Sequence, residues 1–130
     1  MNEMKDGREK RATGSPDRPI LIMVTAGGRN DAERIGEGLV EGRMAACCTV
    51  IPTVHSFYYE EGQLKREHES LLLVKTVESR AKAVQEYVLA NHSYDVPEIL
   101  QVAIESGSPT YLQWLADQVS VSTSDRPANT

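Results

Sequence analysis

Residues 45–76 form two long, strand-like limbs joined by a short polar turn, and no other feature constrains the fold as much. The first limb, 45–59, is rich in β-branched and aromatic residues, which favour strands. The turn, 60–63, is polar and contains Gly62, a pattern typical of a β-hairpin. Two strands alone are marginally stable in water, so other elements of the chain or another copy must cover this hairpin.

Pro52 and two histidines of the hairpin lead to more specific predictions. Pro52 cannot donate a hydrogen bond to a neighbouring strand, so we expect the first strand to be bulged or to lie at a sheet edge there. If the turn is centred on Glu61 and Gly62, His55 lies opposite His68, with Cβ atoms about 4.5–5.5 Å apart. Two imidazoles at this distance could share a metal ion, or they could be exposed polar residues of a solvated ribbon. A bulge between them would break the pair.

The segments around the hairpin alternate between apolar strands and amphipathic helices. Residues 19–26 are a continuous apolar run, which predicts a strand buried on both faces. Asn30 followed by Glu33 is typical of a helix N-cap, and we expect this helix to continue to about Met44. The remaining predicted elements are a helix at 78–91, a strand at 99–105 and a helix that starts at Ser108-Pro109.

The order β-α-β-β-α-β plus one helix predicts an α+β protein with a ferredoxin-like fold. In that fold two helices lie on one face of an antiparallel sheet. The opposite face is bare unless other subunits cover it, and we expect the long hairpin to reach a neighbouring copy. The polar ends, 1–18 and 121–130, are predicted to be disordered tails of a single domain, 19–120.

Charge and apolar content exclude several classes of function. The chain has 130 residues, a net charge of -5 and a pI near 5.2, so we expect no binding to nucleic acid, which requires clustered Lys and Arg. It contains no apolar run of about 18 residues, so we expect no membrane contact. No apolar core of a secretory signal is present near Met1, which predicts a cytoplasmic protein. Cys47 and Cys48 are adjacent and should point to opposite faces of a strand, which argues against a disulfide framework.

A set of short motifs resembles the CutA family of divalent-cation tolerance proteins. In chain order the motifs are Ala45-Ala46-Cys47, Ser56-x-Tyr58, Gly62, Glu69, Lys75-Thr76, His92-x-Tyr94-x-x-Pro97-Glu98 and Tyr111-Leu112-x-Trp114. Together, in this order and at this spacing, they are highly specific, and they cover residues 19–119. The resemblance implies a ferredoxin-like subunit in a tight homotrimer, similar in architecture to PII-like signalling proteins. It also implies a role in tolerance of copper and other divalent metals, with no established catalytic reaction.

The metal ligands that we predict are His92, Glu98 and Cys47. Imidazole nitrogen and carboxylate oxygen suit Cu²⁺ or Zn²⁺, and a thiolate binds Cu(I) or Zn²⁺ well. Cys47 is included because of its position in the family motif, and the implied trimer places these weak sites in clefts between subunits. His92 could instead cap the end of the preceding helix, and Cys47 could be a small hydrophobic residue. We expect no organic cofactor.

Simpler roles are predicted for several other side chains. Glu67 and Glu69 share one face of the second hairpin limb, where they could face Lys75 or Arg66 of a neighbouring subunit, or solvent. For Lys75 we favour an ion pair between subunits. Tyr111 and Trp114 are predicted to be packing residues of the last helix.

Two other functions remain open beside metal tolerance. One is a PII-like signalling trimer that binds a small anionic ligand between subunits, and the other is a structural trimer without a ligand. Gly27-Gly28 between a strand and a helix is a faint signal of an anion site, since it lacks the G-x-G-x-x-G pattern. An enzyme is not expected, because the sequence contains no recognisable set of nucleophile, base and orienting group.

Overall fold

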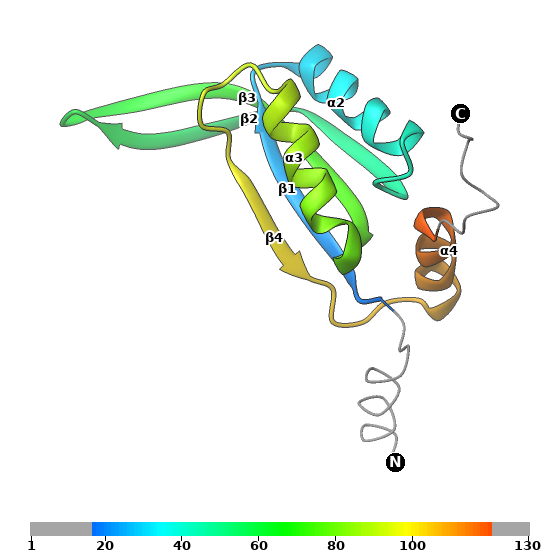
Figure 1. The fold of residues 1–130 in the computed structure, drawn as a ribbon. Helices are drawn as coiled ribbons and strands as arrows, with labels where there is room; N and C mark the ends of the chain where they lie inside the picture. The colour runs from blue at the N-terminus through cyan, green and yellow to red at the C-terminus, as the bar shows by residue number, and fades with distance from the viewer. Residues whose placement is uncertain (1–16, 121–130) are drawn as a thin grey trace.

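The computed structural model describes residues 17–120, and the rest of the predicted tails lies outside this range. The described part is an α+β fold with a four-stranded antiparallel sheet in the order β2-β3-β1-β4, which confirms the ferredoxin-like prediction (Figure 1). The elements are β1 (Pro19–Ala26), α2 (Arg29–Glu41), β2 (Cys47–Glu60), β3 (Gln63–Val77), the 3-10 helix η1 (Glu78–Arg80), α3 (Ala81–Asn91), β4 (Ile99–Ala103) and α4 (Pro109–Val119). Asp17 and Arg18, at the end of the predicted first tail, accept hydrogen bonds from Ser79 and Glu78.

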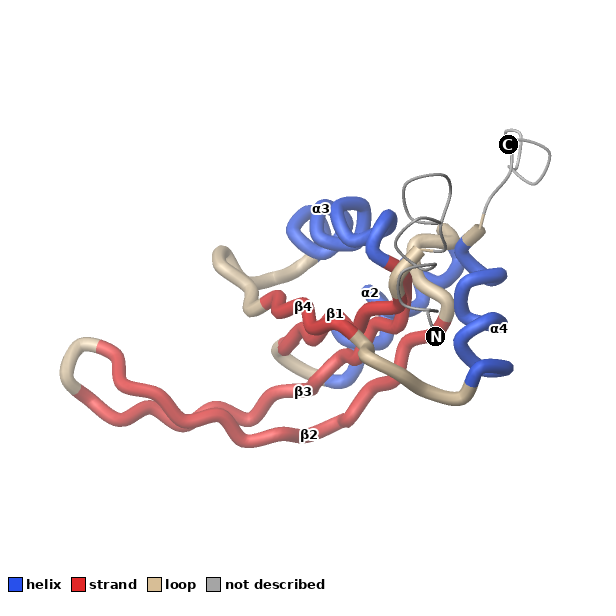
Figure 2. The backbone as a smooth tube through the Cα atoms, turned by 90° about the horizontal axis from the view of Figure 1, so that it is seen from below, coloured by secondary structure: helices blue, strands red, loops and turns tan. Residues whose placement is uncertain are grey.

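The core lies between one face of the sheet and the two helices α2 and α3, which cover that face (Figures 1 and 2). Alternate residues of β1 and β3 point to this side, and each is at most 2% exposed: Ile20, Ile22, Val24, Leu72 and Val74. α2 comes very close to the sheet at Gly36. A Cβ atom added there would lie 3.1 Å from Cδ1 of Leu72 and 3.2 Å from Cβ of Cys48. The absence of a side chain at Gly36 therefore permits the close helix–sheet packing.

The opposite face of the sheet is apolar but only partly buried within one chain. Strand pairing aligns Leu100, Met23 and Leu73 across it, and it also carries Ile51 and Val102. Ile51, Val102 and Leu100 are 39%, 43% and 51% exposed. We call this surface the open face. In a single subunit β1 is fully buried on the helix side, whereas its open-face residues Leu21 and Met23 are half-buried, because α2 and α3 both lie on the other side.

β2 and β3 form the predicted long hairpin, which projects far beyond the rest of the sheet (Figure 1). At the turn, Glu61 and Gly62 both have positive φ, at 54° and 76°, as the tight hairpin turns require. The pairing shifts between Ile51 and Val54, so a bulge lies at Pro52 in an edge strand, as predicted. A bulge bends the strand that carries it, and here it marks where the hairpin leaves the core.

The start of α2 differs from the prediction. The helix begins at Arg29 with Gly28 as N-cap, and no side chain in the described part of the chain caps it. The carbonyl of Gly28 accepts the first helical hydrogen bond from Ala32, at 3.1 Å. Asn30 therefore lies inside the helix, because the tight Gly27-Gly28 connection starts the helix directly after β1.

α4 begins as predicted, with Ser108 as N-cap accepting a hydrogen bond from the amide of Tyr111. Its buried residues, Leu115 and Val119, pack on Ala46 and Val77 at the end of the sheet remote from the hairpin turn (Figure 1). Tyr111 and Trp114 are each 41% exposed, and their rings contact each other in a tilted arrangement with centroids 5.5 Å apart, so their predicted packing role is not fulfilled within one chain. None of the helices within residues 17–120 has the length and apolar character of a membrane span.

Candidate functional site

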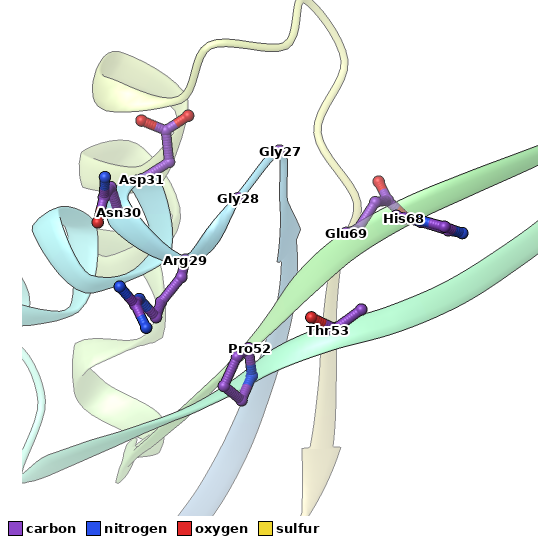
Figure 3. A pocket seen from close by; sticks show the side chains of 9 residues that line it. All are labelled: Gly27, Gly28, Arg29, Asn30, Asp31, Pro52, Thr53, His68 and Glu69. Atoms are coloured by element: carbon purple, nitrogen blue, oxygen red, sulfur yellow. The ribbon is translucent and has the colours of Figure 1, made fainter.

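A pocket of about 640 Å³ opens at the root of the hairpin (Figure 3). The β1–α2 connection and the first turn of α2 form one wall, and the bulged part of β2 with the facing part of β3 forms the other. The lining residues are Gly27, Gly28, Arg29, Asn30, Asp31, Pro52, Thr53, His68 and Glu69. We call it the hairpin-root pocket. It is of mixed charge, since Arg29 and the uncapped amides of α2 attract anions whereas Asp31 and Glu69 attract cations.

Glu69 connects the hairpin to the loop that follows α3. One of its carboxylate oxygens accepts a 2.7 Å hydrogen bond from the hydroxyl of Ser56, and the other accepts a 3.0 Å hydrogen bond from the hydroxyl of Tyr94. Tyr94 also lies against Gly27, where an added Cβ would be 3.7 Å from the phenol ring. Ser56 thus holds Glu69 within the hairpin through one oxygen, and the other oxygen positions the loop beside the pocket.

We expect Tyr94 to ionise only at unusually high pH, because partial burial of the phenol and its hydrogen bond to the Glu69 carboxylate raise its pKa from 10.0 to about 12. The hydrogen bond is therefore fully present below pH 10 and is lost as the pH rises through about 12. The measurement is phenolate absorbance against pH, taken as the difference between the wild type and Tyr94→Phe. In a Glu69→Gln background this pKa should fall, since the negative neighbour is gone. A wild-type difference curve centred at pH 10 would contradict the assignment, and Tyr59→Phe, at a 76% exposed tyrosine, is the control.

His92 directly follows α3, and both of its ring nitrogens are already hydrogen bonded. Nδ1 accepts the amide hydrogen of Tyr94 at 3.0 Å, so Nε2 carries the proton and donates to the carbonyl of Thr25 at 2.7 Å. The ring thereby connects the loop to the end of β1. A metal can bind His92 only if one of these hydrogen bonds is released.

The three predicted metal ligands do not meet within one chain. Across the sheet, Cys47 of β2 lies opposite Lys75 of β3, and Lys75 lies opposite Leu21 of β1. His92, in contrast, is hydrogen bonded to Thr25, further along β1. Thr25 is four positions beyond Leu21 along β1, which is about 13 Å. Glu98 is exposed and directly precedes β4, whose Ile99 is paired with Val24, so it lies at the His92 end. Among residues 17–120 no three His, Cys, Asp or Glu side chains are grouped as a metal site.

Cys47 and Cys48 point to opposite faces of β2, as predicted. Cys47 lies on the open face, where the ammonium of Lys75 is 3.7 Å from its sulfur and donates a 2.7 Å hydrogen bond to Thr49. Cys48 lies under α2. Its burial there is the main reason why the pKa of its thiol is raised to about 12, and the nearby Cys47 also raises this pKa, whereas Lys75 lowers it. Cys48 is therefore a small core residue rather than a reactive thiol.

The sequence identified part of this site. The motif of the family resemblance contains both His92 and Tyr94, and their ring centroids are 4.8 Å apart. The sequence missed the hydrogen bonds of Glu69 to Ser56 and Tyr94. The register of the hairpin sets Ser56 opposite Glu67 and diagonal to Glu69, so the first of these contacts could have been inferred.

Comparison with known proteins supports the same assignment as the motifs. The family model described as CutA1 divalent ion tolerance protein matches residues 20–118. The rice (Oryza sativa subsp. japonica) protein named Protein CutA 1, chloroplastic, is 38% identical over 96 residues, which are 74% of this chain and 54% of that protein. This chain thus spans little more than half of the rice protein. The Divalent-cation tolerance protein CutA of Pectobacterium atrosepticum is 37% identical over 103 residues, which are 76% of this chain and 94% of that protein.

The solved structures agree with the fold. The crystal structure of CutA1 from Oryza sativa matches with a TM-score of 0.78 at 34% identity and covers 82% of this chain and 98% of that one. The family match over residues 20–118 includes the sheet, the long hairpin and the loop that carries His92 and Tyr94. On this evidence, the chain belongs to the CutA1 family of divalent ion tolerance proteins.

Proposed function

We propose that this protein is a cytoplasmic homotrimer that binds divalent metal, copper foremost, weakly at clefts between its subunits. The observation that carries the proposal is the match of the CutA1 family model over residues 20–118. The expected ligands are His92, Glu98 and Cys47. No catalytic step and no organic cofactor are part of the proposal.

The open face supports assembly into a trimer. Its central row of Leu100, Met23 and Leu73 is apolar, and burying apolar surface contributes about 25 cal/mol per Å². α2 and α3 lie on the opposite side of the sheet and do not cover the open face. In the proposed trimer, another copy of the chain covers it.

The distribution of the ligands supports sites between subunits rather than within one. His92 and Glu98 lie at one end of the sheet and Cys47 lies near the other. One ion can therefore contact all three residue types only if different subunits supply them. Cys47 is on the open face, so the same assembly that covers this face brings another subunit close to its sulfur.

The test is calorimetric titration of the full chain with Cu²⁺ and Zn²⁺, with mass analysis of the assembly in parallel. We expect metal uptake at a fixed ratio per subunit. Glu98→Gln should lower the affinity for the metal at least about tenfold, because one ligand is lost. His92→Ala should act in the same direction, but it also removes two hydrogen bonds of the loop, so Glu98→Gln is the cleaner variant. Glu105→Gln, at an exposed carboxylate just beyond β4, is the matched control. Weak uptake without a fixed ratio would contradict the proposal.

Binding of a small anionic ligand is a second candidate function, favoured by Arg29 and the uncapped start of α2 in the hairpin-root pocket. Asp31 and Glu69 on the same lining oppose it. Any ligand that binds the folded state alone stabilises it, by about 2.7 kcal/mol at a concentration of 100 Kd. Thermal protection by a nucleotide and not by Cu²⁺ would favour this second function over the first.

A further inference from the structure

His55 and His68 form a cross-strand pair on the projecting part of the hairpin. Pairing of β2 with β3 sets the two residues directly opposite each other, as the turn position predicted. Their rings are stacked, with centroids 4.4 Å apart and planes inclined by 16°. The bulge at Pro52 lies on the core side of the pair, so the register between the pair and the turn is continuous.

We propose that His55 and His68 are a two-imidazole metal site, separate from the His92, Glu98 and Cys47 set. Imidazole nitrogen binds Cu²⁺, Ni²⁺ and Zn²⁺, and two ligands held on neighbouring strands act as a chelate. Rotation about χ2 turns one nitrogen of each ring toward a common point, and this torsion has a broad, roughly two-fold preference. Water completes the coordination of the ion.

The nitrogens of this pair are available, in contrast to those of His92. Both side chains are exposed, and within residues 17–120 neither ring is hydrogen bonded to the protein. His92 has to break a hydrogen bond to bind an ion, whereas His55 and His68 displace only water. Of the histidines in this chain, these two therefore form the more accessible site.

The surroundings indicate which ions fit. The cationic neighbour on this face is Arg66, and its guanidinium is 4.8 Å from the centroid of Phe57 in a cation–π contact. The carboxylates of Glu67 and Glu69 are on the other face of the ribbon, where they accept hydrogen bonds from Tyr58 and Ser56, respectively. Figure 3 shows the side chains of His68 and Glu69 leaving β3 in different directions. Within residues 17–120 no carboxylate joins the pair from its own face of the ribbon, although Asp31 and Glu69 line the hairpin-root pocket with His68. Two imidazoles suit Ca²⁺ and Mg²⁺ poorly, since these ions prefer oxygen ligands, so neither should compete. Affinity should follow Cu²⁺ over Ni²⁺ and Zn²⁺.

The test is titration of the full chain with Cu²⁺, read by electron paramagnetic resonance, in a background that carries Glu98→Gln. The expected result is a Cu²⁺ signal with two coordinated nitrogens that persists in this background. His55→Asn and His68→Asn should each weaken binding by roughly 10²-fold, because one tethered ligand is lost. Excess Mg²⁺ should leave the signal unchanged. A signal that both His-to-Asn variants retain overturns the inference, whatever happens at the other site.

Two controls separate the pair from the number of histidines and from general surface change. Tyr59→Asn, on the same face of β2, should leave binding unchanged. The double variant Val54→His with His55→Val keeps the composition but moves one imidazole to the opposite face of the ribbon. It should bind as weakly as His55→Asn, and circular dichroism with mass analysis checks that it folds and assembles. Binding of wild-type strength in this folded double variant overturns the chelate.

Because the two sites use different residues, their failures are distinguishable. Loss of binding in Glu98→Gln alone concerns the intersubunit proposal, and loss in His55→Asn and His68→Asn alone concerns this one. If the hairpin pair were covered by a neighbouring subunit, the wild type would show no signal with two nitrogens, and the inference would be wrong.

Discussion

Leu72→Ala is expected to lower the free energy of unfolding by about 2–5 kcal/mol, since it removes a large side chain from a packed core and leaves a cavity. Leu72 is 0% exposed and lies where α2 approaches the sheet at Gly36. Gly36 has no side chain with which to fill the cavity, so the site can collapse only by moving the helix. The measurement is chemical denaturation at a fixed protein concentration, because assembly makes the apparent stability depend on concentration.

Leu89→Ala is the matched control for Leu72→Ala. Leu89 lies on α3 and is 56% exposed, so the same truncation should change stability by no more than about 0.5 kcal/mol. Equal losses for the two variants would show that burial under α2 is not what makes Leu72 important.

Leu73→Lys is expected to dissociate the proposed trimer into single subunits that remain folded. Leu73 is the next residue along β3 but points to the open face, between Met23 and Thr49 on the neighbouring strands. If another copy covers this face, the ammonium group would be buried without a partner in each subunit, which costs several kcal/mol. In a free subunit the same lysine is solvated and costs little.

The measurement for Leu73→Lys is the mass of the assembly in solution, together with circular dichroism to verify the fold. Leu89→Lys, on the outer side of α3, should leave the mass unchanged. A Leu73→Lys protein that keeps the wild-type mass would show that the open face is not the contact between copies. Leu72 and Leu73 are adjacent, so the two variants also separate the core of the subunit from the assembly.

The fold and the hairpin register follow from local features of the sequence. Gly62 after Glu61 sets the turn, and strict two-residue alternation then places His55 opposite His68 without reference to any distant residue. Pro52 lacks an amide hydrogen, which explains the bulge and the edge position of β2. These predictions were confirmed because each depends on backbone geometry within a few residues.

The helix boundaries and the candidate ligands were less predictable. The capping pattern at Asn30 was overridden because Gly27-Gly28 starts α2 two residues earlier. The ligand set grouped His92 and Glu98 with Cys47, but in one subunit they lie about 13 Å apart along the strand direction alone. No local sequence pattern predicts this distance, because it depends on how the strands are aligned in the sheet.

The sequence by itself therefore determined the order of elements, the ferredoxin-like topology and the facing of His55 and His68. Only the tertiary structure decided that both nitrogens of His92 are used by Thr25 and Tyr94, and that Glu69 holds the loop beside the hairpin-root pocket. The physical reason is the range of the interactions. Alternation and turn geometry act between near neighbours. By contrast, the hydrogen bond from His92 to Thr25 and that from Tyr94 to Glu69 join residues that lie 25 or more positions apart.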